Sequence, residues 1–379
     1  MITSRTDGDD PPTLSALDRD RLSQALALAE SSFGLTEPNP RVGCVIGHAD
    51  GRVLGRGATQ QAGGPHAEVM ALREAQAAGQ ETRGATAWVT LEPCAHHGRT
   101  PPCCDALISA GLARVVVALA DPFPQVNGAG IARLRAAGIA VEMADTDQAA
   151  AAQDINIGFF SRVQRGRPWV RLKVAASLDG ATALPDGQSQ WITGEAARRD
   201  GHAWRRRASA VLTGIGTVLA DDPRLDVRLV PTAAQPARVV VDSHFRLPAT
   251  ARLLEAPGEV SIYGAVDPTR ATEALRASRA TLHQLPAVDG RVDLPALLRA
   301  LAQAGTNELH VEAGAVLNGA LLRAGLVDEV LLYLAPRLLG PGRPWAQLPV
   351  LQSLSQSIDL VVKDLRLVGE DLRLLARCK

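Results

Sequence analysis

Cysteine, net charge and long apolar segments are all scarce or absent in this chain. Five cysteines in 379 residues are few and odd in number, which argues against a disulfide scaffold. Forty basic and forty acidic side chains cancel, so no overall field favours nucleic acid or a membrane surface as a partner. No apolar run reaches the roughly 18 residues of a membrane span, and Met1–Pro12 lacks the apolar core of a signal peptide. We therefore expect a cytoplasmic protein whose partner is a small molecule, with no nucleic acid and no membrane.

The pattern along the chain predicts two α/β domains, in which buried strands and amphipathic helices alternate. Residues 1–14 are expected to form a disordered tail, and residues 15–146 a first domain with a mostly parallel sheet. An alanine-rich and then basic connector is expected over residues 147–167, followed by the second domain over residues 168–379.

A His-x-Glu triplet and two separated cysteines form the strongest chemical signal. His66 and Glu68 are followed by Cys94, which a proline precedes, and after an insert by the adjacent Cys103 and Cys104. This arrangement is typical of hydrolytic zinc deaminases that act on nucleobases. One histidine and two thiolates fill three tetrahedral positions of zinc and leave the fourth open for water, as in catalytic zinc sites. Glu68 is then the proton carrier and not a ligand.

The local sequence explains how these side chains can reach one site. A glycine- and proline-containing break precedes His66, so His66 and Glu68 can meet at the first turn of the helix that follows, where the helix dipole favours an ionised Glu68. A buried strand is predicted to end at Cys94, and Pro101–Pro102 to open the helix that begins at Cys103. A thiolate is stabilised at such a helix N-terminus.

Other interpretations of this region remain open. Cys103 is chosen as the ligand because two adjacent cysteines cannot easily face one metal, and Cys104 is the alternative. A structural zinc site is a second interpretation, with His96, His97 or Cys104 as a fourth protein ligand. Chance clustering of core histidines and cysteines is a third, and the glutamate two residues after the histidine argues against it.

The second half shows glycine turns after predicted strands, without a metal cluster or a nucleophilic triad. Gly214 and Gly216 follow one strand, and Gly314–Gly319 follows another and opens a helix. Backbone N–H groups at such helix starts can bind phosphate. The full dinucleotide fingerprint and the Lys-Ser/Thr of a nucleotide triphosphate loop are both missing, so plain turns are the alternative interpretation.

Taken together, these motifs resemble the bifunctional deaminase/reductase family of riboflavin biosynthesis. The resemblance covers about residues 15–375, and the insert between Cys94 and Cys103 distinguishes this family from other deaminases. The segments that carry it are Asn39–Gly43, His66–Glu68, Leu91–Cys103, Lys173–Gly180, Gln190–Thr193, Gly214–Pro223 and Val311–Gly314.

The resemblance implies a cytidine-deaminase-like zinc domain followed by a dihydrofolate-reductase-like α/β domain, whose mixed sheet is flanked by helices. The implied reactions are hydrolytic deamination of 2,5-diamino-6-(5-phosphoribosylamino)pyrimidin-4-one and reduction of its ribosyl group to ribityl. A small phosphoribosylaminopyrimidine is thus the expected substrate, Zn²⁺ and NADPH are the expected cofactors, and a homo-oligomer is the expected assembly.

The resemblance also implies roles for individual residues. In the first domain Glu68 is catalytic, His66, Cys94 and Cys103 bind the metal, and Asn39 binds the substrate near its ring. The implied cofactor contacts of the second domain are Ala175, Trp191, Thr217, Asp221, Ser243, Gly314, Ala315, Val316, Leu317, Asn318, Gly319 and Ala320. The implied substrate contacts are Ser189, Arg205, Leu225, Arg228 and Glu312, with Asp179 as a proton relay near the ribose.

Some of these residues have simpler interpretations. Trp191 fits a core residue equally well, and Arg205 fits a solvated helix face among other arginines. Asp226 stands where the family often has a hydroxyl residue and Ala313 where it often has glycine; Asp226 places negative charge close to Arg228. Two alternative functions are a deaminase whose second half only binds or assembles, and a zinc-stabilised nucleotide-binding protein.

Overall fold

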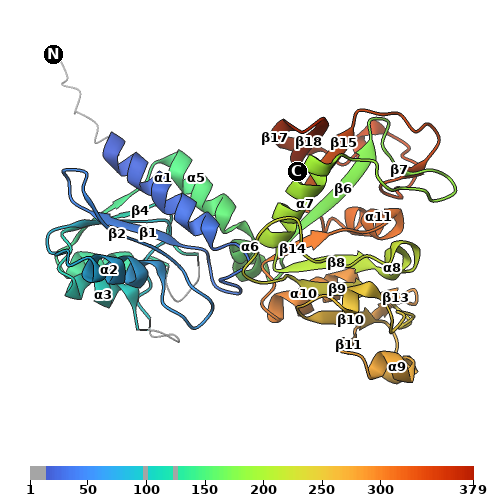
Figure 1. The fold of residues 1–379 in the computed structure, drawn as a ribbon, viewed down its shortest axis with the longest axis horizontal. Coiled ribbons are helices and arrows are strands. Elements are labelled where there is room, and N and C mark those ends of the chain that lie inside the picture. The colour runs from blue at the N-terminus through green and yellow to red at the C-terminus, as the bar shows by residue number, and fades with distance from the viewer. Residues whose placement is uncertain (1–13, 97–100, 123–126) are drawn as a thin grey trace, which may run out of the picture. The chain divides into compact units, whose positions relative to one another are not determined.

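The computed structural model describes residues 14–96, 101–122 and 127–379, and the chain forms two compact units (Figure 1). The first unit comprises Met1–Asn156 and the second Ile157–Lys379. Nearly all of the tail expected at residues 1–14 lies outside the described residues, as does His97. Within the described ranges, no helix combines the length and the apolar character that crossing a bilayer requires.

The first unit is a five-stranded sheet in the order β2-β1-β3-β4-β5, with α1 and α5 on one face and α2 and α3 on the other (Figure 1). Its strands are β1 (Gly43–Gly47), β2 (Val53–Ala58), β3 (Thr86–Val89), β4 (Arg114–Val117) and β5 (Ala140–Met143). Its helices are α1 (Ala16–Ser31), α2 (Ala67–Ala77), α3 (Cys103–Ser109), α4 (Ala129–Ala136) and α5 (Thr146–Ile155).

The sheet of the first unit is mixed, so the expectation of a mostly parallel sheet is wrong. Strand β1 pairs antiparallel with both β2 and β3, whereas β3 with β4 and β4 with β5 are parallel. The physical reason lies in the turn at Asp50–Gly51, which returns the chain at once and therefore joins antiparallel strands.

Helix α1 is fastened to the sheet through one buried carboxylate. Ser15 and Asp18 form a capping box at the helix N-terminus. Asp18 Oδ1 also accepts hydrogen bonds from Trp88 Nε1 and Arg114 Nη1, each at 2.7 Å. Burial disfavours the charged carboxylate, but these hydrogen bonds prevail and hold the pKa of Asp18 well below its usual range. A single side chain thus joins α1 to β3 and β4.

The second unit contains a nine-stranded sheet in the order β11-β10-β9-β8-β14-β6-β15-β18-β17. Its longer strands are β6 (Trp169–Ser177), β8 (Ala210–Gly214), β9 (Ala237–Val241), β10 (Val260–Gly264), β11 (Thr281–Gln284), β14 (Glu308–Val311), β15 (Glu329–Ala335), β17 (Leu360–Val368) and β18 (Asp371–Cys378). Short ribbons are made by β7 (Ala181–Ala183) with β16 (Arg343–Pro344), and by β12 (Ala287–Val288) with β13 (Arg291–Val292). The helices are α6 (Ile157–Arg165), α7 (Glu195–Arg207), α8 (Ile215–Asp221), α9 (Glu273–Arg276), α10 (Leu294–Gln303) and α11 (Ala315–Arg323).

The mixed sheet expected for this unit is confirmed. In this sheet the neighbouring strands along β11-β10-β9-β8-β14-β6-β15 pair in parallel. The pairings of β18 with β15 and with β17 are antiparallel. One face of the central strands, around Leu172 and Val311, packs against apolar side chains of α10 and α11. Alternate residues point to the opposite face, which α7 covers through Trp204.

A ladder of opposite charges crosses four strands on the face that α7 covers. Arg171 Nη1 lies 2.8 Å from Glu308 Oε2, and Arg171 Nε lies 2.6 Å from Glu329 Oε2. Arg207 pairs with Glu308 at 2.8 Å and Arg377 with Glu329 at 3.2 Å. Arg171, Glu308 and Glu329 are all buried, so each needs the partner of opposite sign that the ladder provides.

The residues expected to form a connector lie mainly in two helices, one in each unit. Helix α5 contacts α1, and the side-chain amide of Asn156 both donates to and accepts from the backbone of Arg41. Helix α6 contacts β6 and β14 of the second unit, and its Arg165 pairs with Asp328 at 2.8 Å.

Candidate functional site

The first part of the candidate metal centre lies at the start of α2. His66 is the N-cap residue of this helix and has extended backbone angles (φ −77°, ψ 169°). Glu68 belongs to the first helical turn and is only 3% exposed. Because the chain is still entering the helix at His66, the two side chains can serve one site, as the sequence predicted.

The second part is the turn between β3 and α3. Cys94 follows β3, and Cys103 is the first residue of α3. The backbone N–H of Cys103 donates to Cys94 Sγ at 3.3 Å, and the N–H of Cys104 donates to Cys94 O at 3.2 Å. The start of α3 therefore supplies N–H groups to Cys94, an environment that favours a thiolate.

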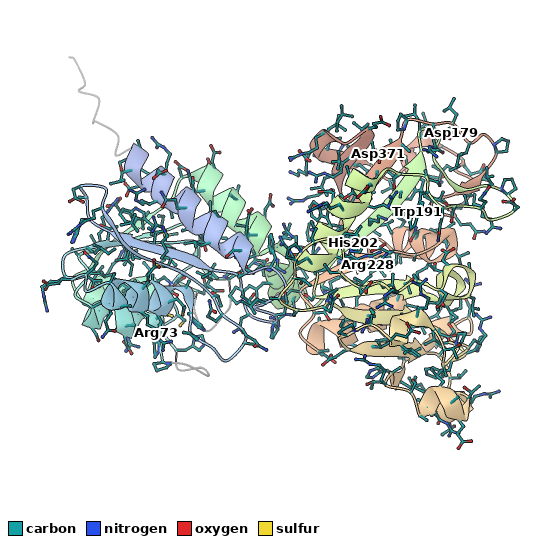
Figure 2. The ribbon with its side chains drawn as sticks, in the orientation of Figure 1. Arg73, Asp179, Trp191, His202, Arg228 and Asp371 are labelled. Atoms are coloured by element: carbon teal, nitrogen blue, oxygen red, sulfur yellow. The ribbon has the colours of Figure 1, made fainter. Side chains whose placement is uncertain are left out.

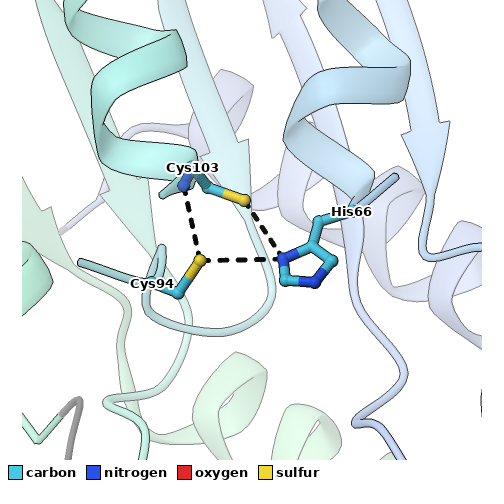
Figure 3. Close-up of side chains that lie close together, drawn as sticks. All are labelled: His66, Cys94 and Cys103. Carbon is cyan, nitrogen blue, oxygen red and sulfur yellow. Dashed lines mark hydrogen bonds between the residues drawn. The ribbon is translucent and has the colours of Figure 1, made fainter. Parts of the chain in front are cut away.

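His66, Cys94 and Cys103 lie together and could hold one metal ion (Figure 3). Their ligand atoms all lie within 4.8 Å of one another. His66 Nδ1 is 3.2 Å from Cys103 Sγ and 3.7 Å from Cys94 Sγ. Zinc bonds of ~2.0–2.3 Å at tetrahedral angles would separate such atoms by about 3.6–3.8 Å. The donor set fits zinc, and the 3.7 Å separation between His66 Nδ1 and Cys94 Sγ lies in this range, whereas the 3.2 Å separation from Cys103 Sγ is shorter.

Cys104 and His96 are described and do not join this group of ligands. Cys104 Sγ donates to Pro93 O at 3.2 Å and to Gly130 O at 3.5 Å, so it points away from Cys103. Among the described residues, the only cluster with metal-ligand spacing consists of His66 and the two cysteines. The arrangement leaves a fourth position free of these side chains, which suits a catalytic site better than a structural one.

The thiols, the imidazole and the carboxyl group of this centre shift one another's pKa. A hydrogen bond from the Cys103 thiol lowers the pKa of Cys94 to about 4 and raises the pKa of Cys103. The hydrogen bond with Cys94 also raises the pKa of His66. Burial, and then the charge of Cys94, raises the pKa of Glu68 to about 7. The Cys103 thiol, whose pKa is raised, would release its proton when a cation binds.

Asn39 lies in the segment that leads into β1, beside the end of β3. Its N–H donates to Thr36 O at 2.9 Å, and its side chain is half-buried. Gly43, at the start of β1, donates to Thr90 Oγ1 at 3.0 Å. This pairing brings the segment that contains Asn39 to the strand end from which Cys94 follows.

In the second unit, the predicted glycine turns meet at the carboxyl end of the parallel strands. Gly314 is the N-cap residue of α11, and its N–H donates to Thr217 Oγ1 at 3.1 Å. Ser243 follows β9, the neighbour of β8, and its hydroxyl accepts from the Val292 N–H at 3.3 Å. This edge is where open α/β sheets bind ligands, and the start of α11 offers its N–H groups there.

The segment Gly314–Ala320 contains both exposed and packed residues. Val316 is 55% exposed. Asn318 is buried, and its amide donates to Ala313 O and to Trp345 O. A Cβ on Gly319 would lie 2.1 Å from Gln347 O. Asn318 and Gly319 therefore fasten α11 to the segment Trp345–Gln347 of the same chain, whereas Val316 can face a ligand.

Trp191, Ala175 and Asp221 lie on different elements of the same unit. Trp191 is 60% exposed, so its interpretation as a core residue is wrong; Arg198 lies over its ring at 4.6 Å (Figure 2). Ala175 is half-buried in β6. Asp221 ends α8, and burial raises the pKa of its carboxyl group.

Arg205 and Glu312 form a two-pronged ion pair. Arg205 donates from Nε and Nη2 to the two Glu312 oxygens, and from Nη1 to Asp226 O at 2.9 Å. Both side chains are 13% exposed, so the solvated helix face is wrong for Arg205. Lys173 Nζ lies 3.7 Å from Glu312 Oε2. Sequence reasoning did not assign Lys173, although it stands in a quoted motif and its alternation with Arg171 places it on this face.

Arg228 lies on a charged loop beside His202 (Figure 2). Its Nη1 donates to Asp226 Oδ1 at 2.7 Å, and Arg224 Nε donates to Asp226 Oδ2 at 3.1 Å. The Arg228 side chain is 46% exposed. His202 Nδ1 accepts from the Arg228 N–H at 3.1 Å, and burial together with the nearby arginines lowers the pKa of His202 to about 4. Leu225 is buried in the left-handed region at φ 55°, where a non-glycine residue is strained.

Asp179 follows the carboxyl end of β6, and Ser189 lies farther along the chain, before Trp191. The Asp179 carboxylate accepts from the Ser177 hydroxyl at 2.5 Å, from Leu339 N–H at 3.1 Å and from Gly340 N–H at 2.8 Å. Ser189 is half-buried in the loop before Trp191. The hydrogen bonds of Asp179 hold the turn that follows β15.

Comparisons with known proteins identify both units. Residues 16–119 match the cytidine and deoxycytidylate deaminase zinc-binding region, and residues 168–374 match the RibD C-terminal domain. Riboflavin biosynthesis protein RibD of Escherichia coli (strain K12) is 46% identical over 365 residues, which cover 92% of this chain and 96% of that protein. The chain belongs to the RibD family.

Solved structures of the RibD family agree with this assignment over nearly the whole chain. RibD of Acinetobacter baumannii is 42% identical with a TM-score of 0.84, and covers 96% of this chain and 99% of its own. The diaminohydroxyphosphoribosylaminopyrimidine deaminase/5-amino-6-(5-phosphoribosylamino)uracil reductase of Thermotoga maritima is 31% identical with a TM-score of 0.85 and the same coverage. The chain is therefore a bifunctional riboflavin-biosynthesis enzyme with a deaminase and a reductase domain, and the expected fold class is confirmed. Neither a second half that only binds or assembles nor a zinc-stabilised nucleotide-binding protein agrees with this membership.

Proposed function

We propose that the first unit deaminates 2,5-diamino-6-(5-phosphoribosylamino)pyrimidin-4-one and that the second reduces the ribosyl group of the product to ribityl. The observation that carries the first reaction is the convergence of the His66, Cys94 and Cys103 ligand atoms within 4.8 Å, at the start of the helix that carries the buried Glu68. Membership of the RibD family supports the second reaction.

In the deaminase, His66, Cys94 and Cys103 hold zinc, which when bound supplies a Lewis acid that lowers the pKa of water toward ~7. Glu68 accepts one proton from the attacking water and passes it to the ring nitrogen. It then accepts the second proton of the same oxygen and passes it to the leaving amine, which departs as ammonia. Asn39 binds the substrate beside its ring.

In the reductase, NADPH supplies the hydride. Its contacts are assigned to the carboxyl edge of the sheet and to the loops around it: Ala175, Trp191, Thr217, Asp221, Ser243 and the Gly314–Ala320 segment. Exposed Arg228 is the best placed arginine for the substrate phosphate, because its guanidinium can offer two donors to two oxygens. Arg205 acts by holding Glu312, which faces the substrate with Ser189 and Leu225.

Asp179 is the proposed proton relay near the ribose. Its carboxylate already accepts hydrogen bonds from Ser177, Leu339 and Gly340. In this role Asp179 would exchange a proton near the ribose while holding the turn after β15.

We also propose that the chain is a cytoplasmic homo-oligomer. Strand β17 lies at the edge of the nine-stranded sheet, and its Val362, Leu365 and Leu367 side chains are 57–71% exposed. An exposed apolar edge strand is a template for pairing with another chain. Two copies related by a twofold axis would pair β17 with β17, since such interfaces use the same patch on both subunits.

Metal analysis together with separate assays of ammonia release and NADPH oxidation tests the proposed function. The wild-type chain should bind about one zinc ion and perform both reactions. Glu68→Gln should keep its zinc but lose ~10²–10⁴-fold in ammonia release, because the ligands remain and the proton carrier is gone. NADPH oxidation on the deaminated substrate is the internal control. Ammonia release within about twofold of wild type would contradict the role of Glu68.

A further inference from the structure

Glu92 is a buried carboxylate that the proposed chemistry leaves without a role. It lies two residues before the ligand Cys94 and is 4% exposed. Its Oε1 accepts from the N–H groups of Gly130 at 2.9 Å and Ile131 at 3.2 Å. Its Oε2 accepts from Gly128 at 3.0 Å and Asp121 at 3.2 Å. One carboxylate thus satisfies four backbone donors.

Three of those donors belong to the start of α4. Gly128 is the N-cap residue of this helix, and Gly130 and Ile131 lie in its first turn. First-turn N–H groups have no partner within their own helix, and the helix dipole attracts negative charge to the same place. Neighbouring residues usually supply such a cap, but no side chain of the N-cap residue does so here. The cap therefore comes from the strand end that carries Cys94.

Other contacts join α4 to the residues on both sides of Cys94. A Cβ on Gly130 would lie 2.0 Å from Pro93 O, so only glycine permits this close approach. Cys104 Sγ bridges Pro93 O and Gly130 O. On the far side of Cys94, Arg133 Nη1 donates to Ala95 O at 3.1 Å. The backbone is thus held before and after the ligand.

We propose that Glu92 is a positioning residue of the zinc centre, which fixes Cys94 relative to Cys103 by fastening the end of β3 to α4. The proposal rests on the proposed role of Cys94 as a zinc ligand. A ligand whose backbone is fixed in advance loses little freedom when the metal binds, so the same donors hold zinc more tightly. Glu92 acts through Cys94 and does not itself touch substrate or metal.

Glu92→Gln is the sharpest test because it preserves shape and removes only acceptor capacity. Either orientation of the amide would point an NH₂ group at two N–H donors, which cannot bond to it. Zinc affinity, measured by competition with a chelator on the full-length chain, should fall by about 10- to 100-fold, as for other supports of metal ligands. The Co²⁺-loaded variant should also show altered thiolate absorption. Reductase activity of the same chain should stay unchanged.

Glu142→Gln is the matched control. Glu142 also lies in the first unit and accepts from Arg114 through both oxygens, but it is half-exposed and contacts no residue around Cys94 in the described structure. The zinc affinity of the Glu142→Gln variant should equal that of the wild type. Equal affinities for Glu92→Gln and wild type, with an unchanged Co²⁺ spectrum, would overturn the positioning role.

Arg133→Ala separates positioning from a failure to fold. The Arg133 side chain is 43% exposed, so its loss should leave the unit folded while freeing Ala95 O and the Asp105 carboxylate of α3, which Arg133 pairs with at 2.6 Å. A smaller but measurable loss of zinc affinity is expected. If Glu92→Gln does not fold, wild-type affinity in Arg133→Ala overturns the proposal. Full zinc retention by Cys94→Ser would instead refute the underlying ligand assignment, so the two failures are distinguishable.

Discussion

At the residue scale, Asp226 places a carboxylate between two arginines at the expected phosphate-binding loop. Arg224 and Arg228 both donate to it, and an exposed phosphate group would compete with it for the same donors. The half-exposed Arg228 is screened by solvent, so its pair with Asp226 is worth little, about 0–1 kcal/mol. The internal carboxylate therefore weakens the phosphate contact without abolishing it.

Arg228→Ala should weaken binding of the reductase substrate by about tenfold and leave NADPH affinity unchanged, because one charge-assisted contact is lost.

Asp226→Asn should have the opposite effect and tighten substrate binding by about fivefold, since the amide keeps an acceptor but loses the competing charge. Titrations of substrate and NADPH against each variant measure both. A loss of NADPH affinity alone in Arg228→Ala would move this residue to the cofactor site.

The two adjacent cysteines should behave differently although their sequence context is nearly the same. Cys103→Ser should lower bound zinc because thiolates favour zinc strongly over a hydroxyl. Cys104→Ser should keep zinc, since a hydroxyl can still donate to Pro93 O in place of the thiol. Metal analysis of the purified variants decides between them. Loss of zinc in the Cys104 variant alone would reverse the assignment.

At the element scale, α1 depends on Asp18 for its attachment to β3 and β4. The folded-state pKa of Asp18 lies below its unfolded value of about 3.9, so its contribution to stability is complete above that pH. The contribution is lost as pH falls toward the folded pKa, because the unfolded chain then binds more protons.

Asp18→Asn should lower the free energy of unfolding by about 1.5–3 kcal/mol near pH 7, since charged hydrogen bonds to Arg114 and Trp88 are weakened. Thermal unfolding of the wild type and the variant, followed from about pH 7 to about pH 3, measures the difference. The difference in unfolding free energy between wild type and variant should be constant down to ~pH 4 and shrink below it. A difference in unfolding free energy that grows in acid would contradict the lowered pKa of Asp18.

Elements with strong local patterns could be predicted from the sequence, and elements defined by distant partners could not. The helix of Glu68, the strand of Trp88 and the helix of Cys103 were predicted and are confirmed as α2, β3 and α3. The hairpin of β17 and β18 was not predicted, because β17 keeps apolar residues on exposed positions and lacks a clear buried face.

The candidate site divides in the same way. The metal ligands could be predicted because their spacing and residue types encode the chemistry directly. Glu92 could not, because its four donors lie 29–39 residues away along the chain. The pairing of Arg205 with Glu312 joins residues 107 positions apart, so it could not be predicted from the sequence either.

At the scale of the whole molecule, the two units each complete their own sheet. Helix α6 belongs to the second unit, where it contacts β6 and β14 and where Gly158 lies against Asn307. The independent function of that unit should therefore depend on where a fragment begins.

A fragment of residues 157–379 should reduce the deaminated substrate with NADPH, whereas one of residues 168–379 should be less stable. The shorter fragment lacks α6 and both arginines that pair with Asp328, Arg165 and Arg167. Thermal unfolding and NADPH oxidation of the two fragments compare them. A folded but inactive longer fragment would mean that the reductase needs the first unit or an assembly that it organises.

The charge ladder of the second unit also determines how its central strands align. If β14 moved by one residue along β6, Glu308 would turn toward the leucines of α10, and Leu309 would face Arg171. An aliphatic interior alone would penalise such a slip less, because one aliphatic side chain can replace another of similar volume. Buried ion pairs add little net stability. The ladder therefore acts mainly by disfavouring misaligned pairings of the central strands. It thereby keeps the strand ends near Thr217 and Gly314 in register at the carboxyl edge.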